Sequence, residues 1–179
     1  MQSNADGTFL LRNVPPDIYR VTVNALPAGT YVKSIRFGGT DVTKSVLDTT
    51  SGASGQIEVV LSPEAADLSG VVHNAQGDGA AGVAVSLWEP DTPNVLPDAL
   101  LNRNATTDQN GQFQFRNLPP GEYRLAAWEQ TNSNIQDPQF RTKFEGQAAT
   151  VKVTASAHAT NDAPLISQEA IEVEAAKLR

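Results

Sequence analysis

Apolar and polar residues alternate along most of the chain with a period of two, which predicts half-buried β-strands rather than helices. In one run, Val83, Val85 and Leu87 share one face of a strand, whereas Ser86 and Trp88 lie on the other. The same alternation recurs at residues 9–11, 19–23, 57–61, 113–116 and 123–128. Strands of this kind pack one face against a core and leave the other to water, as in antiparallel sheets.

Turn-forming residues separate these runs. Asp6-Gly7 and Asn110-Gly111 each stand just before a strand, as in hairpin turns that need a positive φ. Twin prolines at 15–16 and 119–120 stand before the next strand. Proline cannot donate a hydrogen bond to a strand ladder, so each pair predicts a bend between two strands. Many short strands joined by glycine and proline turns are typical of sandwiches and barrels. We therefore predict an all-β protein in which antiparallel sheets pack face to face.

Two stretches of the chain are variants of one motif. Residues 7–21 read GTFLLRNVPPDIYRV and residues 111–125 read GQFQFRNLPPGEYRL, with 8 of 15 positions identical at an offset of 104 residues. Such a match predicts two related units, and we expect two tandem antiparallel β-sandwiches. The boundary falls near residues 62–66, so unit one is residues 1–65 and unit two is residues 66–179. No long flexible linker separates them.

The two units differ in what precedes the motif. The second motif follows 41 residues, 70–110, that contain two strand patterns, whereas six residues precede the first motif. We therefore expect the first sandwich to lack its front strands. Either Met1 is an artificial start within a longer chain, or something else completes unit one. An open sheet edge recruits other strands, so self-association through the edge of unit one is expected.

Two segments do not follow the strand pattern. Residues 137–144 begin with a helix N-cap candidate and a proline, and they place Phe140 and Phe144 four residues apart. This pattern predicts one short surface helix. Residues 167–179 combine Ile171 and Val173 with good helix formers, and we predict a terminal strand followed by a frayed helix.

Composition excludes several classes of protein. Apolar residues make up 40% of the 179 residues and charged residues 18%, which suits a packed core. Twenty acidic against 13 basic side chains give a net charge of −7, so no nucleic acid partner is expected. The chain has no cysteine, which excludes disulfides, thiolate zinc sites and cysteine nucleophiles. No signal peptide pattern is visible in residues 1–20.

Four segments of unit two occur in the order of a known family pattern. They are residues 68–72, 79–87, 106–113 and 118–125. Together they resemble the carboxypeptidase regulatory-like domain family, a prealbumin-like (transthyretin-like) β-sandwich. Unit one is similar only over residues 6–21, with Asp17 in place of the usual glycine, and residues 31–42 resemble the sequel found in bacterial multi-module proteins. The resemblance implies a non-catalytic accessory module, found in exported or cell-surface bacterial proteins.

We predict no catalytic residues and no cofactor. The histidines, His73 and His158, have no glutamate at the spacing of metalloprotease motifs, and the family pattern supplies no catalytic residue. Residues 108–111 resemble a fragment of a calcium loop, which makes Asp108 and Asn110 candidate metal ligands. The downstream glutamate of such a loop is missing, and a tight turn explains the same residues.

Two tryptophans are the candidate ligand-binding residues. Trp88 and Trp128 both fall on the polar phase of their strands, and exposed indoles stack on sugar rings. A second interpretation is that each indole closes an end of the sandwich or packs beneath the 91–103 loop and the helix that carries Phe140 and Phe144. The two interpretations differ in whether the indoles reach solvent.

Arginines recur at the same places in both motifs. Arg12 matches Arg116, and Arg20 matches Arg124. Recurrence within a structural motif favours pairing with nearby carboxylates, such as those of Asp17 and Glu122, or with loop carbonyls. The alternative is a phosphate or acidic-glycan site.

Two functional hypotheses follow. The first is a structural spacer and interaction surface within a larger exported bacterial protein, whose partners are the neighbouring modules of that protein. The alternative is a carbohydrate-binding module in which Trp88 and Trp128 form the sugar platform and the partner is a polysaccharide. The family resemblance implies that the chain is extracellular, at the cell surface or in the periplasm.

Overall fold

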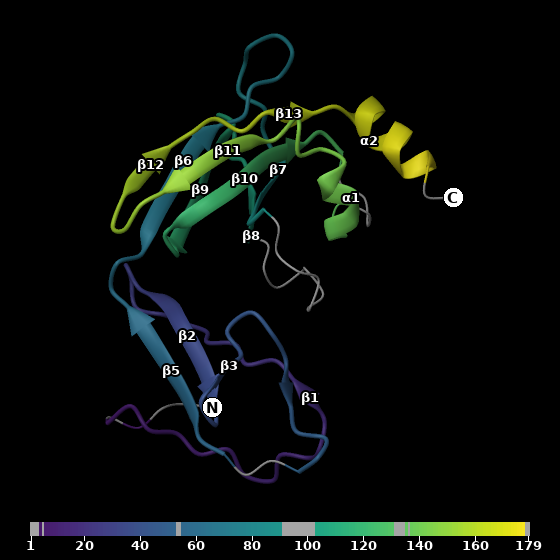
Figure 1. The fold of residues 1–179 in the computed structure, drawn as a ribbon. Coiled ribbons are helices and arrows are strands. Elements are labelled where there is room, and N and C mark those ends of the chain that lie inside the picture. The colour runs from purple at the N-terminus through teal and green to yellow at the C-terminus, as the bar shows by residue number, and fades with distance from the viewer. Residues whose placement is uncertain are drawn as a thin grey trace.

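The computed structural model describes residues 4, 6–52, 55–90, 103–130, 135 and 137–177. These residues form thirteen strands and two short helices (Figure 1). The strands of unit one are β1 (Ile18–Tyr19), β2 (Tyr31–Phe37), β3 (Thr40–Asp41), β4 (Leu47–Asp48) and β5 (Ile57–Ser62). The elements of unit two are β6 (Ala66–Val71), β7 (Ala84–Trp88), β8 (Arg103–Thr106), β9 (Gln112–Leu118), β10 (Gly121–Trp128), α1 (Pro138–Thr142), β11 (Ala149–Val153), β12 (His158–Thr160), β13 (Leu165–Ile166) and α2 (Gln168–Ala176). The predicted all-β class is confirmed.

Unit two contains two sheets that share one core. The larger sheet has the order β11-β10-β7-β8, with β13 paired in parallel to β10, and the smaller has the order β12-β6-β9. Alternate residues of the central strands point into the space between the sheets, as period-two alternation requires. The buried core side chains include Leu68, Val85, Leu87, Phe113, Phe115, Tyr123, Leu125 and Val151. Two packed sheets of this kind form a β-sandwich.

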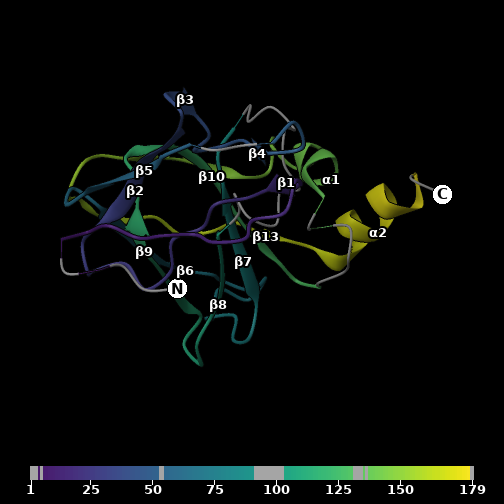
Figure 2. The same ribbon diagram turned by 90° about the horizontal axis from the view of Figure 1, so that it is seen from below.

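The outer face of the larger sheet is also covered. Residues from β7 and β10 form a second buried cluster with α1, α2 and Ile135, and α2 then extends away from the sheets toward the C-terminus (Figure 2). Helix α1 begins at Asp137, whose side chain accepts a hydrogen bond from the Gln139 amide. Among the described residues, neither helix has the length and apolarity needed to cross a bilayer.

The structure confirms one prediction for the helical segments and corrects the other. Helix α1 is the predicted short surface helix: Gln139 and Thr142 are exposed, whereas Phe140 is buried against the sheet. The predicted terminal strand at Ile171 and Val173 is wrong. Helix α2 takes these residues instead, with Ser167 as its N-cap, and Ile171 is buried in the second cluster. The packing of Ile171 against the second cluster therefore stabilises residues 168–176 as a helix and not as a strand.

The turn and the bend of the two motifs have the same backbone conformation. Gly7 and Gly111 both have a positive φ, at 81° and 76°. Asn13 and Asn117, which precede the twin prolines, both have a φ of 55°. Asparagine is among the few non-glycine residues that adopt this left-handed conformation readily. Two stretches 104 residues apart therefore turn the chain at equivalent residues in the same way.

The tyrosines of the two motifs also make the same contact. The Tyr19 hydroxyl donates to the carbonyl oxygen of Pro15 at 2.8 Å, and the Tyr123 hydroxyl donates to that of Pro119 at 2.7 Å. Each tyrosine thus closes the corner around its own twin-proline bend. The corner is a local structure that forms in both sequence contexts.

Unit one differs from unit two in its strands. Its described residues form a two-stranded pair, β1 with β4, and a three-stranded sheet in the order β3-β2-β5. The strand predicted around Phe9 and Leu11 is wrong: residues 8–14 lie in no strand. In unit two the corresponding β9 pairs with β6, but no described strand of unit one occupies that position. A sequence with the alternation of a strand does not form one when no neighbouring strand is there to hydrogen-bond with its backbone.

Candidate functional site

The two candidate tryptophans lie at the ends of adjacent strands. Trp88 ends β7 and Trp128 ends β10, on the sheet face that looks away from the sandwich core, so their predicted phase is correct. The exposure that the sugar-platform interpretation requires is absent, because the exposed fractions are 6% for Trp88 and 1% for Trp128. The alternation in β7 and β10 predicts that this face of the sheet is polar and exposed. Other elements cover it, and it forms a second buried face.

Aromatic contacts and one hydrogen bond hold the indoles in place. The Trp88 and Trp128 rings are stacked with centroids 6.4 Å apart, and the Phe144 ring meets Trp128 edge-on at 5.5 Å. The Trp128 indole N–H donates to Ser86 Oγ at 2.9 Å. The Arg141 guanidinium lies 5.6 Å from the Trp88 ring centroid, and burial lowers the pKa of Arg141 to about 10. The cluster has the composition of a core.

This packing decides between the two interpretations of the tryptophans. The helix that carries Phe140 and Phe144 covers them, as the second interpretation holds. Most of the loop named with it, residues 91–102, lies outside the described residues. Stacking on a sugar requires an accessible indole face, and neither Trp88 nor Trp128 offers one. The carbohydrate hypothesis thereby loses the platform on which it was based.

The carboxylate of the candidate calcium loop serves a turn. Asp108 Oδ1 accepts hydrogen bonds from the backbone amides of Asn110 at 2.8 Å and Gln112 at 2.9 Å. In unit one, Asp6 Oδ1 accepts from the Thr8 amide at 2.9 Å in a related turn. Among the residues that the structure describes, no three His, Cys, Asp or Glu side chains converge as metal ligands would. Turn formation accounts for Asp108 and Asn110.

The two histidines lie apart, each near one aspartate. His73 Nε2 is 3.7 Å from Asp162 Oδ2, and His158 Nδ1 is 3.6 Å from Asp67 Oδ2. All four side chains reach solvent, where such pairs contribute at most about 1 kcal/mol. Their positions fit sheet-surface residues.

The sequence did not reveal a cleft of about 680 Å³ between the two units. Four basic side chains line it, Arg20 and Lys44 from unit one and Arg103 and Arg116 from unit two, together with Glu89. Lys44 and Glu89 form an ion pair across the cleft. No local pattern could predict this site, because its walls come from segments that meet only in the folded chain.

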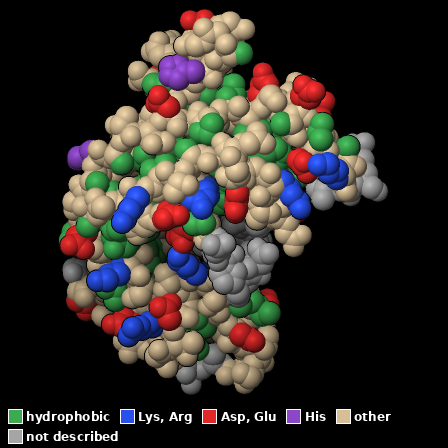
Figure 3. Space-filling model, turned by 45° about the horizontal axis from the view of Figure 1, so that its top comes forward, with side chains coloured by type: hydrophobic (Ala, Val, Ile, Leu, Met, Phe, Trp, Pro, Cys, Tyr) green, Lys and Arg blue, Asp and Glu red, His purple; other side chains and the backbone are tan. Residues whose placement is uncertain are grey.

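Burial shifts the pKa of three side chains that line this cleft. Burial lowers the pKa of Arg20 below its ordinary value. It raises the pKa of Tyr123 to about 12, and it lowers the pKa of the Arg103 guanidinium below its ordinary value. Elsewhere, basic and acidic side chains are interspersed on the face drawn in Figure 3. The cleft therefore concentrates positive charge in a chain whose net charge is −7.

The prediction for the recurring arginines is confirmed at one position. Arg124 Nη1 lies 3.1 Å from Glu122 Oε1 and also donates to Thr150 Oγ1 at 2.8 Å. Arg116 instead donates from Nε to the side-chain oxygen of Gln114 at 2.9 Å. Both are contacts between neighbours on the sheet surface, as a structural role requires.

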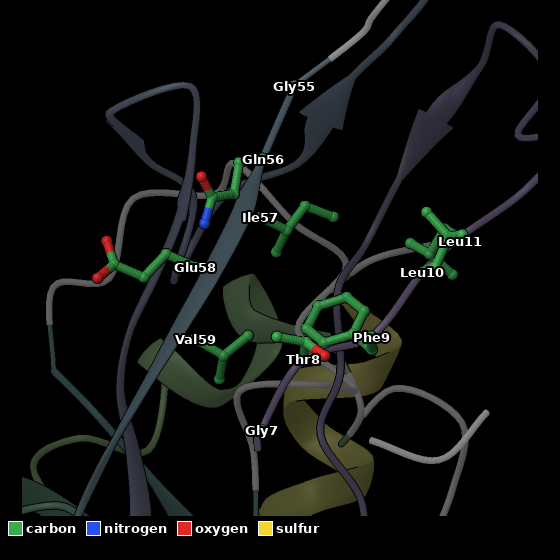
Figure 4. Close-up of a pocket in the computed structure, with 10 residues that line it drawn as sticks. All are labelled: Gly7, Thr8, Phe9, Leu10, Leu11, Gly55, Gln56, Ile57, Glu58 and Val59. Carbon is green, nitrogen blue, oxygen red and sulfur yellow. The ribbon is translucent and has the colours of Figure 1, made fainter. Parts of the chain in front are cut away.

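A second hollow, a groove of about 390 Å³, lies wholly within unit one (Figure 4). One wall is residues 7–11, and the other is residues 55–59, which lead into and form the first half of β5. Ile57 and Val59 point from β5 toward the side of Phe9, whereas Glu58 points away (Figure 4). The groove therefore contains the apolar side chains of Phe9, Ile57 and Val59 between two stretches of extended chain, together with polar residues such as Thr8 and Gln56.

Comparison with known families agrees with the sandwich and its corner. Residues 67–165, which make up more than half of the chain, match the carboxypeptidase regulatory-like domain. The chain belongs to the carboxypeptidase regulatory-like domain family. The match covers unit two of this family member from β6 to β13, including the turn at Gly111 and the tyrosine corner. The resemblance inferred from the motifs is thus confirmed.

Solved structures similar to this carboxypeptidase regulatory-like protein are distant. A candidate carbohydrate-binding protein from Pseudomonas aeruginosa is 20% identical, with 56% of this chain and 88% of that chain covered and a TM-score of 0.35. The TIE protein of Bacillus anthracis is 13% identical, with 62% of this chain and 19% of that chain covered and a TM-score of 0.38. The major pilin SpaD of Corynebacterium diphtheriae is 14% identical, with 56% of this chain and 29% of that chain covered and a TM-score of 0.35. The chain thus spans less than a third of the last two proteins. A search among curated proteins finds no match.

Proposed function

We propose that the chain is a non-catalytic interaction module, in which two linked β-units serve as spacer and docking surface within a larger exported bacterial protein. Membership of the carboxypeptidase regulatory-like domain family supports an accessory role. The partners on this proposal are the neighbouring modules of the same protein. Residues 1–65 and 66–179 form the two units, each with its own tyrosine corner.

The joint between the units is the observation that carries this proposal. Strand β5 ends at Ser62 and β6 begins at Ala66, so the connection is too short to act as a flexible linker. The Gly29 amide of unit one donates to the side-chain oxygen of Asn117 at 3.1 Å, and the Lys44–Glu89 ion pair lies nearby. Such a joint favours a fixed angle between the units, which is what a spacer needs.

Asn117 provides a direct test of this joint. Asn117→Gly keeps a residue that tolerates a φ of 55° but removes the side-chain oxygen that binds Gly29. We expect this substitution, combined with Lys44→Ala, to broaden the distance distribution between spin labels placed on β2 and on β11. Each contact contributes about 1 kcal/mol, so removing both should visibly loosen the joint.

The repeated motif supplies the matched control. Asn13→Gly makes the same change at the same φ in unit one, where the side chain is exposed and lies outside the joint. We expect the Asn13→Gly protein to keep the narrow distribution of the unaltered protein. A distribution that is already broad in the unaltered protein would contradict the spacer proposal.

A further inference from the structure

Exposed apolar side chains gather around the groove of unit one. Among the described residues, seven large hydrophobic side chains are exposed, and all but Val173 belong to unit one. The six are Leu10, Leu11, Val14, Ile18, Val60 and Leu61. Five of them continue the two walls of the groove, residues 10–14 on one side and β5 on the other. An apolar patch of this kind at a sheet edge marks an interaction surface.

Among the described residues, the backbone beside the groove has no strand paired to it on the groove side. Within the described part of the chain, residues 9–14 belong to no strand and make no backbone hydrogen bond. Strand β5 pairs with β2 alone, so its other edge faces the groove without a neighbouring strand. Extended chain that the described residues do not pair into a sheet, on both sides of a groove that contains Phe9, Ile57 and Val59, suits the addition of a strand.

Unit two shows which element fills the corresponding place. There β6 lies between β9, to which it is antiparallel, and β12, to which it is parallel. Leu68 at the centre of β6 pairs with Phe115 on one side and with Ala159 on the other. By the repeat, Phe115 corresponds to Leu11 of the groove wall. The wall formed by residues 8–14 therefore corresponds to β9, the strand beside which β6 lies in unit two.

We propose that this groove binds one extended strand of another polypeptide, antiparallel to residues 8–14 and parallel to β5. The strand must carry small or aliphatic residues at alternate positions on its inward face, as Ala66, Leu68, Gly70 and Val72 do in unit two. Its backbone pairs with both walls, and its apolar side chains cover Leu11, Ile57 and Val59. This proposal rests on the docking role proposed above and names the partner's chemistry.

A peptide with the sequence of residues 64–74, EAADLSGVVHN, is the probe for this site. On titration of the full chain with this peptide, we expect slowed hydrogen exchange at the backbone amides of residues 9–14 and 55–60. A control peptide with Leu68→Asp and Val72→Asp has the same backbone and should give no protection. Because the probe is a separate molecule, the result does not depend on the angle between the units.

Two neighbouring leucines supply matched protein variants. Leu11 lies in phase with the buried Phe115, whereas Leu10 corresponds to the exposed Gln114. Leu11→Asp should weaken peptide binding about tenfold or more, since it puts a charge where an apolar contact forms. Leu10→Asp should leave binding within about twofold. Both side chains are exposed in the unbound chain, so neither substitution should unfold it.

Three results would overturn the proposal. The first is no protection at residues 9–14 at any soluble concentration of the peptide. The second is equal binding of the two peptides, which would show that side chains do not select the strand. The third is a dimer, seen by sedimentation, that Leu11→Asp disrupts and the peptide does not, because the occupant would then be a second copy of this chain. Each leaves the spin-label test of the joint unaffected.

Discussion

Replacing Trp128 with alanine is expected to lower the free energy of unfolding of unit two by about 3–5 kcal/mol. The side chain is 1% exposed, stacks on Trp88, meets Phe144 edge-on and donates to Ser86. Truncation leaves a cavity between the sheet and α1 and removes the donor to the Ser86 hydroxyl, which keeps its own bond to Asn104. Few substitutions in this unit should cost more.

Urea unfolding followed by far-UV circular dichroism measures this loss. Val173→Ala is the control, because Val173 is 51% exposed on α2 and its loss should change stability by less than about 0.5 kcal/mol. A loss below about 1 kcal/mol for Trp128→Ala would mean that the indole is not packed as described. An exposed sugar platform would give that outcome.

The second large effect concerns the turn glycines of the repeated motif. A Cβ on Gly111 would stand 2.7 Å from both the Ala80 amide nitrogen and the Val72 carbonyl oxygen, with φ at +76°. A Cβ on Gly7, at φ +81°, would meet nothing within 4 Å. Gly7→Ala should therefore lower the free energy of unfolding by only about 1–2 kcal/mol, which is the penalty for placing alanine in a left-handed backbone conformation. Gly111→Ala should cost roughly 3 kcal/mol or more, because backbone atoms must also move.

Thermal unfolding of the two glycine variants, side by side with the unaltered protein, measures the difference. The substitution is chemically identical and the local turn is the same, so the unequal losses report only what surrounds each turn. Equal losses would contradict the close approach of β6 and its following residues to Gly111.

Local alternation was sufficient to predict the central strands of unit two and the faces of their residues. The phase that places Val85 and Leu87 opposite Ser86 and Trp88 is the phase observed. The corner was predictable because its determinants, a glycine turn and twin prolines, lie within fifteen residues. Short-range chemistry of this kind survives even where the surrounding sheet differs.

Features that depend on distant segments were not predictable in the same way. Trp88 and Trp128 are buried by residues between 135 and 171. The alternation within β7 and β10 cannot predict this burial, because it carries no information about which distant segments cover the sheet. The alternation at residues 9–11 predicted a strand that does not form. Alternation indicates which side chains share a face, but a strand also needs a neighbouring strand to pair with. The inter-unit cleft is likewise a product of tertiary packing.

Unit one contains the same corner as unit two, but among the described residues no strand of unit one takes the place that β6 fills in unit two. Hydrogen exchange of the isolated protein, resolved to single amides, tests it most directly. We expect fast exchange for residues 9–12 and slow exchange for those amides of the counterparts, residues 113–116, that point toward β6 from β9 at the edge of the sheet. Equal, strong protection of both stretches would contradict it.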